Sequence, residues 1–204
     1  IYFKHGAACT TSIGRTMLEL GRDFVEQELS GILSSLHEAL INNDDSAWEN
    51  ILNKRLKERD TKFEEELKGF LVDFFSKYIM KPRVVYGDTD SIFINMDLKD
   101  KNTGIDVYDK ITLYYCIELG KISSKFLKTL LPYPHNMEYE KTFYPFAQMA
   151  KKKYVGNKYE DDINSFKFSC MGVVLKRRDN APIVKKIIGS TVSYTHLTLP
   201  TNRE

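Results

Sequence analysis

Two aspartates that lie two positions apart are the residues of this sequence best suited to chemistry. They stand in a short polar run between apolar, strand-forming residues: Tyr86-Gly87-Asp88-Thr89-Asp90-Ser91. Because side chains at positions i and i+2 of an extended chain point to the same side, we expect Asp88 and Asp90 to share one face, with Thr89 pointing away. We expect Gly87 to give the backbone the freedom for a sharp reversal. Two neighbouring carboxylates repel one another unless a cation lies between them, and hard oxygen ligands favour Mg²⁺ or Mn²⁺ over zinc.

An Asp-x-Asp triplet alone does not identify such a site. It is often only a polar turn between strands, and it also occurs after an apolar strand in glycosyltransferases that hold Mn²⁺ and a nucleotide sugar. The longer string here, with two valines before Tyr86 and Ile-Phe-Ile after Ser91, is more restrictive. It resembles the carboxylate hairpin in the palm of family B DNA polymerases. The resemblance implies that Asp90 and Asp88 are catalytic carboxylates at a site for two Mg²⁺ ions, with Mn²⁺ as a substitute.

Composition and charge are those of a soluble globular protein, with 204 residues, 42% hydrophobic content and a net charge of +2. The charge is unevenly distributed, since residues 44–73 are rich in Asp and Glu and residues 151–186 in Lys and Arg. Such a basic stretch suits a polyanion, although it is also typical of a solvated surface. The three cysteines form no CxxC pair, which argues against a zinc site or a disulfide framework. No apolar run has the length of a membrane span, so we expect an intracellular protein that is not secreted.

Helical and strand patterns are mixed along the chain, which predicts an α+β fold. Helices are indicated by apolar residues at helical spacing or by capping signals. The predicted helices cover 12–40, a segment starting at Ser46, 63–78, 107–131 and a segment following Asp179. The predicted strands cover 83–86, 91–97, 137–149, 153–155 and 166–175, with a polar loop over 99–104.

Two segments after the hairpin extend the resemblance to family B polymerases. Residues 137–146 resemble the strand in which the glutamate before the lysine, here Glu140, lies near the metals. Strand alternation would place Glu138 on the same face, as a weaker candidate. Residues 151–156 resemble the Lys-Lys-Arg-Tyr segment, which implies that Lys152 and Tyr154 hold the primer terminus from the minor groove. A lysine there can reach acceptors common to every base pair, and Lys153 stands where arginine is common.

The resemblance also implies a domain order. Residues 1–41 correspond to a fingers-to-palm segment, 42–80 to a helical elaboration, 81–175 to the palm and 176–192 to the start of the thumb. In the last of these, Arg177 and Arg178 would contact phosphates, although a salt bridge with Asp179 is an alternative for Arg178. Residues 193–204 resemble nothing in the family, so we expect a non-native, disordered tail there.

The function implied is part of a DNA-directed DNA polymerase that adds dNTPs to a primer 3′ end by two-metal nucleotidyl transfer. Residues 132–134 and 171–182 most resemble the delta-type polymerases of large nucleocytoplasmic DNA viruses, which implies viral replication in the host nucleus or a cytoplasmic viral factory. The implied partners are primer–template DNA, dNTPs and a sliding clamp or other processivity factor. The family's third acid and fingers helix are not in this sequence, so we expect an inactive fragment. A Mn²⁺-dependent glycosyltransferase and a non-catalytic DNA-binding relative are the alternatives.

Overall fold

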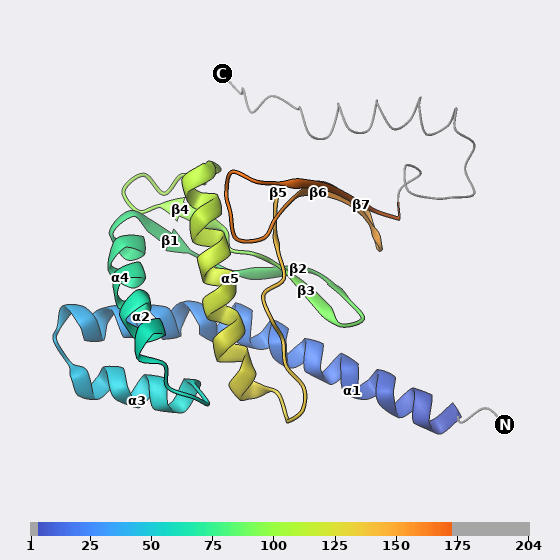
Figure 1. Cartoon of the computed structure of the whole chain (residues 1–204), viewed down its shortest axis with the longest axis horizontal. Coiled ribbons are helices and arrows are strands. Elements are labelled where there is room, and N and C mark those ends of the chain that lie inside the picture. The colour runs from blue at the N-terminus through green and yellow to red at the C-terminus, as the bar shows by residue number, and fades with distance from the viewer. Residues whose placement is uncertain (1–3, 173–204) are drawn as a thin grey trace, which may run out of the picture. The chain divides into compact units, whose positions relative to one another are not determined.

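A computed structural model describes residues 4–172 of the chain, which divide into two compact units (Figure 1). The first unit comprises the described residues up to Tyr139, and the second begins at Glu140. Helices and strands both occur, which confirms the predicted α+β class. The helix predicted after Asp179, the thumb segment and the tail 193–204 lie outside the described residues, as do the last positions of the strand predicted over 166–175.

One long helical segment begins the first unit and contains a π-helical turn. It consists of α1 (Lys4–Asp23), η1 (Phe24–Glu28) and α2 (Leu29–Ile41), which run end to end in Figure 1. In η1 the amide of Leu29 donates to the carbonyl of Phe24, five residues back. This wider turn takes in one extra residue and so rotates the faces of α1 and α2 relative to each other. The helix predicted over 12–40 is confirmed, but its apolar spacing did not reveal the π turn.

Aspartate side chains begin the next two helices. The Asp44 carboxylate accepts from the amide of Ala47 at 2.9 Å, at the start of α3 (Asp45–Arg55). Asp60 accepts from the amides of the first turn of α4 (Thr61–Lys77) in the same way. Such caps satisfy amides that have no partner within the helix. The predicted start at Ser46 was therefore wrong by one residue, because Asp44 supplies the cap instead.

The core of the first unit forms where the helices pack against one another. Helix α5 (Lys110–Leu130) begins with a capping box between Asp109 and Thr112 and confirms the helix predicted over 107–131. Large side chains with almost no exposed surface come from α2, α3, α4 and α5: Leu33, Leu36, Leu52, Leu67, Leu71, Phe74, Leu119 and Phe126. Burial of this kind is the main stabilising contribution to a domain of this size.

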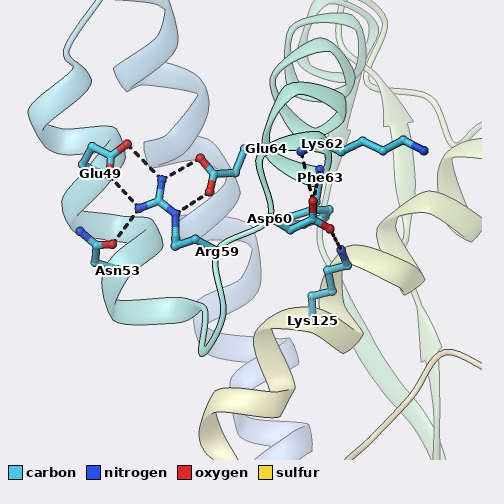
Figure 2. A network of polar contacts seen from close by, with 8 residues as sticks. All are labelled: Glu49, Asn53, Arg59, Asp60, Lys62, Phe63, Glu64 and Lys125. Atoms are coloured by element: carbon cyan, nitrogen blue, oxygen red, sulfur yellow. Dashed lines mark hydrogen bonds and ion pairs between the residues drawn. The ribbon is translucent and has the colours of Figure 1, made fainter.

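A charged network fixes the connection between α3 and α4 (Figure 2). The Arg59 guanidinium donates to Glu49 at 2.7 Å, to Glu64 and to Asn53. The Asp60 carboxylate, besides capping α4, lies 3.6 Å from the ammonium of Lys125 on α5. Exposed ion pairs are individually weak, but a guanidinium shared by several acceptors holds one geometry. The network therefore defines how α3 and α4 meet.

Two small antiparallel pairs complete the first unit. β1 (Tyr78–Met80) pairs with β4 (Leu98–Asp100), and β2 (Arg83–Asp88) pairs with β3 (Ser91–Asn95). The predicted strands around the aspartates are confirmed. The polar loop predicted over 99–104 was wrong at its start, because residues 99 and 100 lie in β4.

The second unit is a three-stranded antiparallel sheet in the order β5-β6-β7. Its strands are β5 (Thr142–Ala150), β6 (Lys153–Tyr159) and β7 (Lys167–Met171). Val155 and Cys170 are buried on one face with Ala147 packed against them. The strand predicted over 137–149 begins only at Thr142, five residues later than expected.

Candidate functional site

The two aspartates lie at the tip of the β2–β3 hairpin. Asp88 is the last residue of β2 and pairs with Ser91, so that Thr89 and Asp90 form the connection. Thr89 has a φ of 56°, in the left-handed region that β-branched residues avoid. The expectation that Gly87 provides the reversal was wrong, because Gly87 lies inside β2 opposite Ile92. Strained backbone of this kind is concentrated at functional sites in proteins.

Asp90 lies in the turn, so strand alternation does not determine the direction of its side chain. That rule holds for an extended chain, and the strand ends at Asp88. The Asp88 carboxylate accepts from the hydroxyl of Thr89 at 3.1 Å, and the hydroxyl of Ser91 donates to the Asp88 carbonyl at 3.2 Å. Asp88 is half-buried and Asp90 is exposed. The two acids are therefore neighbours in the turn, where the amide of Asp90 donates to the carbonyl of Asp88 at 2.6 Å, rather than partners on one strand face.

The oxygen donors of this hairpin suit Mg²⁺ or Mn²⁺ in kind but are incomplete in number. Carboxylates are the ligands that these hard cations prefer. Within residues 4–172 no group of three or more His, Cys, Asp or Glu side chains gathers in a way that could hold a metal. Asp88 and Asp90 could therefore supply part of a metal site, with further ligands from elsewhere.

The hairpin is held by ring packing between its two strands and by one hydrogen bond to a residue distant in the sequence. The rings of Tyr86 and Phe93 lie 5.5 Å apart across the two strands, which places Tyr86 in the hairpin as the sequence predicted. Register shifts between Val84 and Tyr86, so the ladder is irregular there. At this irregularity the amide of Val84 donates to the Glu26 carboxylate at 2.9 Å. Glu26 belongs to the π-helical turn, and no sequence pattern indicated this contact.

A groove of about 330 Å³ lies between α1 and the hairpin. Helix α1 contributes Arg15, Leu18, Glu19 and Arg22, and the hairpin contributes residues 84–87 and Ile92. Arg15 pairs with Glu19 at 3.1 Å, and Arg22 pairs with Asp23 at 2.8 Å. The neighbouring Asp23 carboxylate raises the pKa of Arg22. The groove therefore carries cations that are already matched by carboxylates of the same helix.

The predicted glutamates do not lie on the strand that was expected to carry them. Glu140 is exposed, precedes β5 and forms an ion pair with Lys141. Glu138 accepts from the Asn136 amide at 2.9 Å and lies 3.8 Å from the Lys128 ammonium. Because β5 begins only at Thr142, strand alternation does not place Glu138 and Glu140 on one face. The strand predicted for residues 137–141 was therefore wrong, and the metal-site roles of Glu138 and Glu140 stay predictions.

The predicted DNA-contacting lysines occupy the β5–β6 turn. Ala150 pairs with Lys153, so Lys151 and Lys152 form the connection, and Lys152 has a φ of 59°. All three lysines are exposed. Tyr154 is only 8% exposed and packs against two rings, with centroid distances of 5.8 Å to Phe143 and 5.6 Å to Phe146. Lys152 therefore lies in a turn, where strand alternation with Tyr154 does not apply.

The candidate residues thus form two groups, one in each unit. Asp88 and Asp90 lie at the β2–β3 turn, and Lys152, Lys153 and Tyr154 lie at or beside the β5–β6 turn. Arg177 and Arg178 lie outside the described residues.

Residues 1–198 match the sequence pattern of DNA polymerase family B. The chain belongs to this family. The match includes the first residues of the segment 193–204, for which a non-native origin stays a prediction. None of the helices between residues 4 and 172 is long and apolar enough to cross a membrane.

Individual family B relatives include viral and cellular polymerases. A DNA polymerase of Pyramimonas orientalis virus is 50% identical over 109 residues, which are 53% of this chain and 9% of that protein. A DNA polymerase of Acanthamoeba polyphaga mimivirus is 43% identical over 109 residues, 53% of this chain and 6% of that protein. The DNA polymerase delta catalytic subunit of Drosophila melanogaster is 32% identical over 107 residues, 52% of this chain and 9% of that protein. The match spans less than a tenth of each relative, and it confirms the resemblance to giant-virus and delta-type polymerases.

Proposed function

We propose that this chain is part of a DNA-directed DNA polymerase that extends a primer by adding dNTPs during viral DNA replication. The observation that carries the proposal is the carboxylate hairpin, Asp88 and Asp90 at a strained two-residue turn, in a chain that belongs to DNA polymerase family B. Residues 81–175 would form the palm, and 176–192 would begin the thumb. The protein would act inside the host cell, in the nucleus or in a cytoplasmic viral factory, with a processivity factor as a partner.

In this proposal Asp88 and Asp90 hold divalent metal, Mg²⁺ or Mn²⁺, together with a third acid. When bound, the metal supplies Lewis-acid stabilisation of the charge that develops during phosphoryl transfer. The hairpin contributes by orienting its two carboxylates. Thr89 donates to one of them, and Ser91 holds the backbone of the turn.

The turn formed by Lys151 and Lys152, called the basic turn below, would bind the primer. Lys152 and Lys153 extend from the β5–β6 hairpin, where the buried ring of Tyr154 supports the strand behind them. Ammonium groups at such a turn can reach phosphates and minor-groove acceptors without selecting a sequence. Arg177 and Arg178 would add phosphate contacts. Family membership argues against the glycosyltransferase alternative, whereas a non-catalytic relative requires an experiment.

Metal binding tests the hairpin directly in the 204-residue chain. Mn²⁺ added to the ¹⁵N-labelled protein should broaden the amide resonances of residues 88–91 first. The double variant Asp88→Asn/Asp90→Asn should lose this broadening. The matched control, Asp161→Asn/Asp162→Asn, removes two adjacent exposed carboxylates elsewhere and should keep it. Equal broadening of the hairpin in both double variants would show that Asp88 and Asp90 do not form a metal site.

DNA binding tests the substrate class. Fluorescence anisotropy with a labelled primer–template should detect DNA binding. The logarithm of the binding constant should fall linearly with the logarithm of the salt concentration. UDP-sugars should not compete. Direct binding of a UDP-sugar by the protein, together with DNA binding that is undetectable at low salt, would contradict the proposal.

A further inference from the structure

Gly172 contacts the basic turn more closely than any side chain could. It follows β7 directly and has a φ of 63°, in the left-handed region that favours glycine. A Cβ atom at this position would lie 2.0 Å from the carbonyl oxygen of Lys152 and 3.2 Å from Cγ of Lys153. Contacts of 2.0 Å do not occur between real atoms of this kind. Any side chain at 172 would therefore displace either the end of β7 or the turn.

The strand register explains why these residues meet. Tyr154 pairs with Met171 in the β6–β7 ladder, so the residue after Met171 arrives beside the start of β6. The turn there has its own unusual backbone, since Lys152 has a φ of 59°. Two left-handed positions on neighbouring segments, Lys152 and Gly172, thus pack backbone against backbone. A Cβ atom at position 172 would clash with the backbone carbonyl of Lys152 rather than with the mobile end of a side chain. The turn could therefore relieve the clash only by moving the backbone of Lys152.

We infer that Gly172 is a positioning residue for Lys152. Its missing side chain lets the end of β7 lie against the Lys151–Lys152 turn, and this contact sets where the Lys152 ammonium meets nucleic acid. The inference rests on the proposed function, in which Lys152 contacts the primer. Displacements of about 1 Å are enough to weaken a contact of this kind.

DNA affinity measured across salt concentrations tests this role in the 204-residue chain. Loss of one cationic contact should lower the magnitude of the salt slope by about one and weaken binding about eightfold at 0.1 M salt. We expect Lys152→Ala to show this loss and Gly172→Ala to show most of it. The double variant should bind like Lys152→Ala alone, because a displaced lysine that has been removed cannot be lost twice.

Gly104→Ala is the matched control. Gly104 has a similar φ of 69°, but a Cβ atom there would meet nothing within 4 Å. The variant therefore introduces the same backbone strain without a clash, and we expect it to bind DNA like the parent. A loss in Gly104→Ala equal to that in Gly172→Ala would overturn the inference.

The possible failures are distinguishable. If Lys152→Ala binds DNA like the parent, the primer contact in the proposed function is wrong. If Lys152→Ala weakens binding while folded Gly172→Ala does not, or if the two losses add, the positioning role is wrong. Protection of the Val155 and Cys170 amides reports whether the sheet has folded. If Gly172→Ala unfolds it, a nuclear Overhauser contact between Gly172 Hα and Lys153 in the parent decides: its presence supports the inference and its absence overturns it.

Discussion

Replacing Glu26 with alanine should loosen the carboxylate hairpin at Val84. The Glu26 carboxylate accepts from the Val84 amide at 2.9 Å, where the β2–β3 register shifts. A hydrogen bond to a charged acceptor contributes about 1.5–3 kcal/mol when shielded, and a typical bond about 0.5–1.5 kcal/mol. Because Glu26 is exposed, the lower range applies. That range corresponds to about 2- to 12-fold faster opening at Val84.

Amide hydrogen exchange measures this change residue by residue. Glu26→Ala should accelerate exchange at Val84, while amides in the α5 core stay unchanged. Glu26→Gln keeps a carbonyl acceptor and should restore most of the protection. Gln27→Ala, at the exposed neighbouring position of the same π turn, controls for helix effects. If Glu26→Ala and Gln27→Ala give the same exchange rate at Val84, the hydrogen bond does not support the hairpin.

Two further changes test the packing and the charges of the first unit. Gly120→Ala should lower the free energy of unfolding in urea by about 1 kcal/mol, because overpacking against the Tyr139 ring, 2.6 Å from the added Cβ, outweighs the helical preference for alanine. A Cβ atom added at Gly31 would have no atom within 4 Å, so Gly31→Ala should raise the free energy of unfolding by about 1 kcal/mol. The reverse order of the two variants would refute this packing. The hydrogen bond from Lys77 lowers the pKa of Asp73, so its stabilisation should be present above the ordinary value of about 3.9 and disappear as pH falls through the lowered pKa. The stability difference between the parent and Asp73→Asn should accordingly shrink at acid pH, and a constant difference from pH 7 to pH 2 would contradict it.

Long elements with a strong apolar period were predictable from the sequence. Helix α5 follows from its repeating apolar face, which buries residues such as Leu119 and Phe126. β4 was missed because three residues, two of them charged, show no period. The π turn was missed because one extra residue barely changes the spacing over a helix of this length. Its consequence, the contact of Glu26 with Val84, joins residues 58 positions apart and leaves no local signal.

The candidate site was predictable as residue types but not as geometry. Asp88 and Asp90 were found by the string that contains them, and the hairpin around them was correctly expected. The backbone conformation of the turn was not predicted correctly. Local propensity favours Gly87 for the reversal and disfavours the left-handed conformation that Thr89 adopts. Lys152 likewise takes a left-handed turn position that its residue type does not indicate. In both hairpins the left-handed conformation falls on a residue that local preference does not select.

The most direct test is primer extension by a polymerase that contains this segment together with the rest of its catalytic domain. Asp90→Asn should lower the Mg²⁺-dependent rate by at least about a hundredfold, as expected for a group that stabilises developing charge. Asp162→Asn, a change of the same kind at an exposed turn, should leave the rate unaltered. Equal rates for Asp90→Asn and the parent would show that the hairpin is not the metal-binding part of the active site.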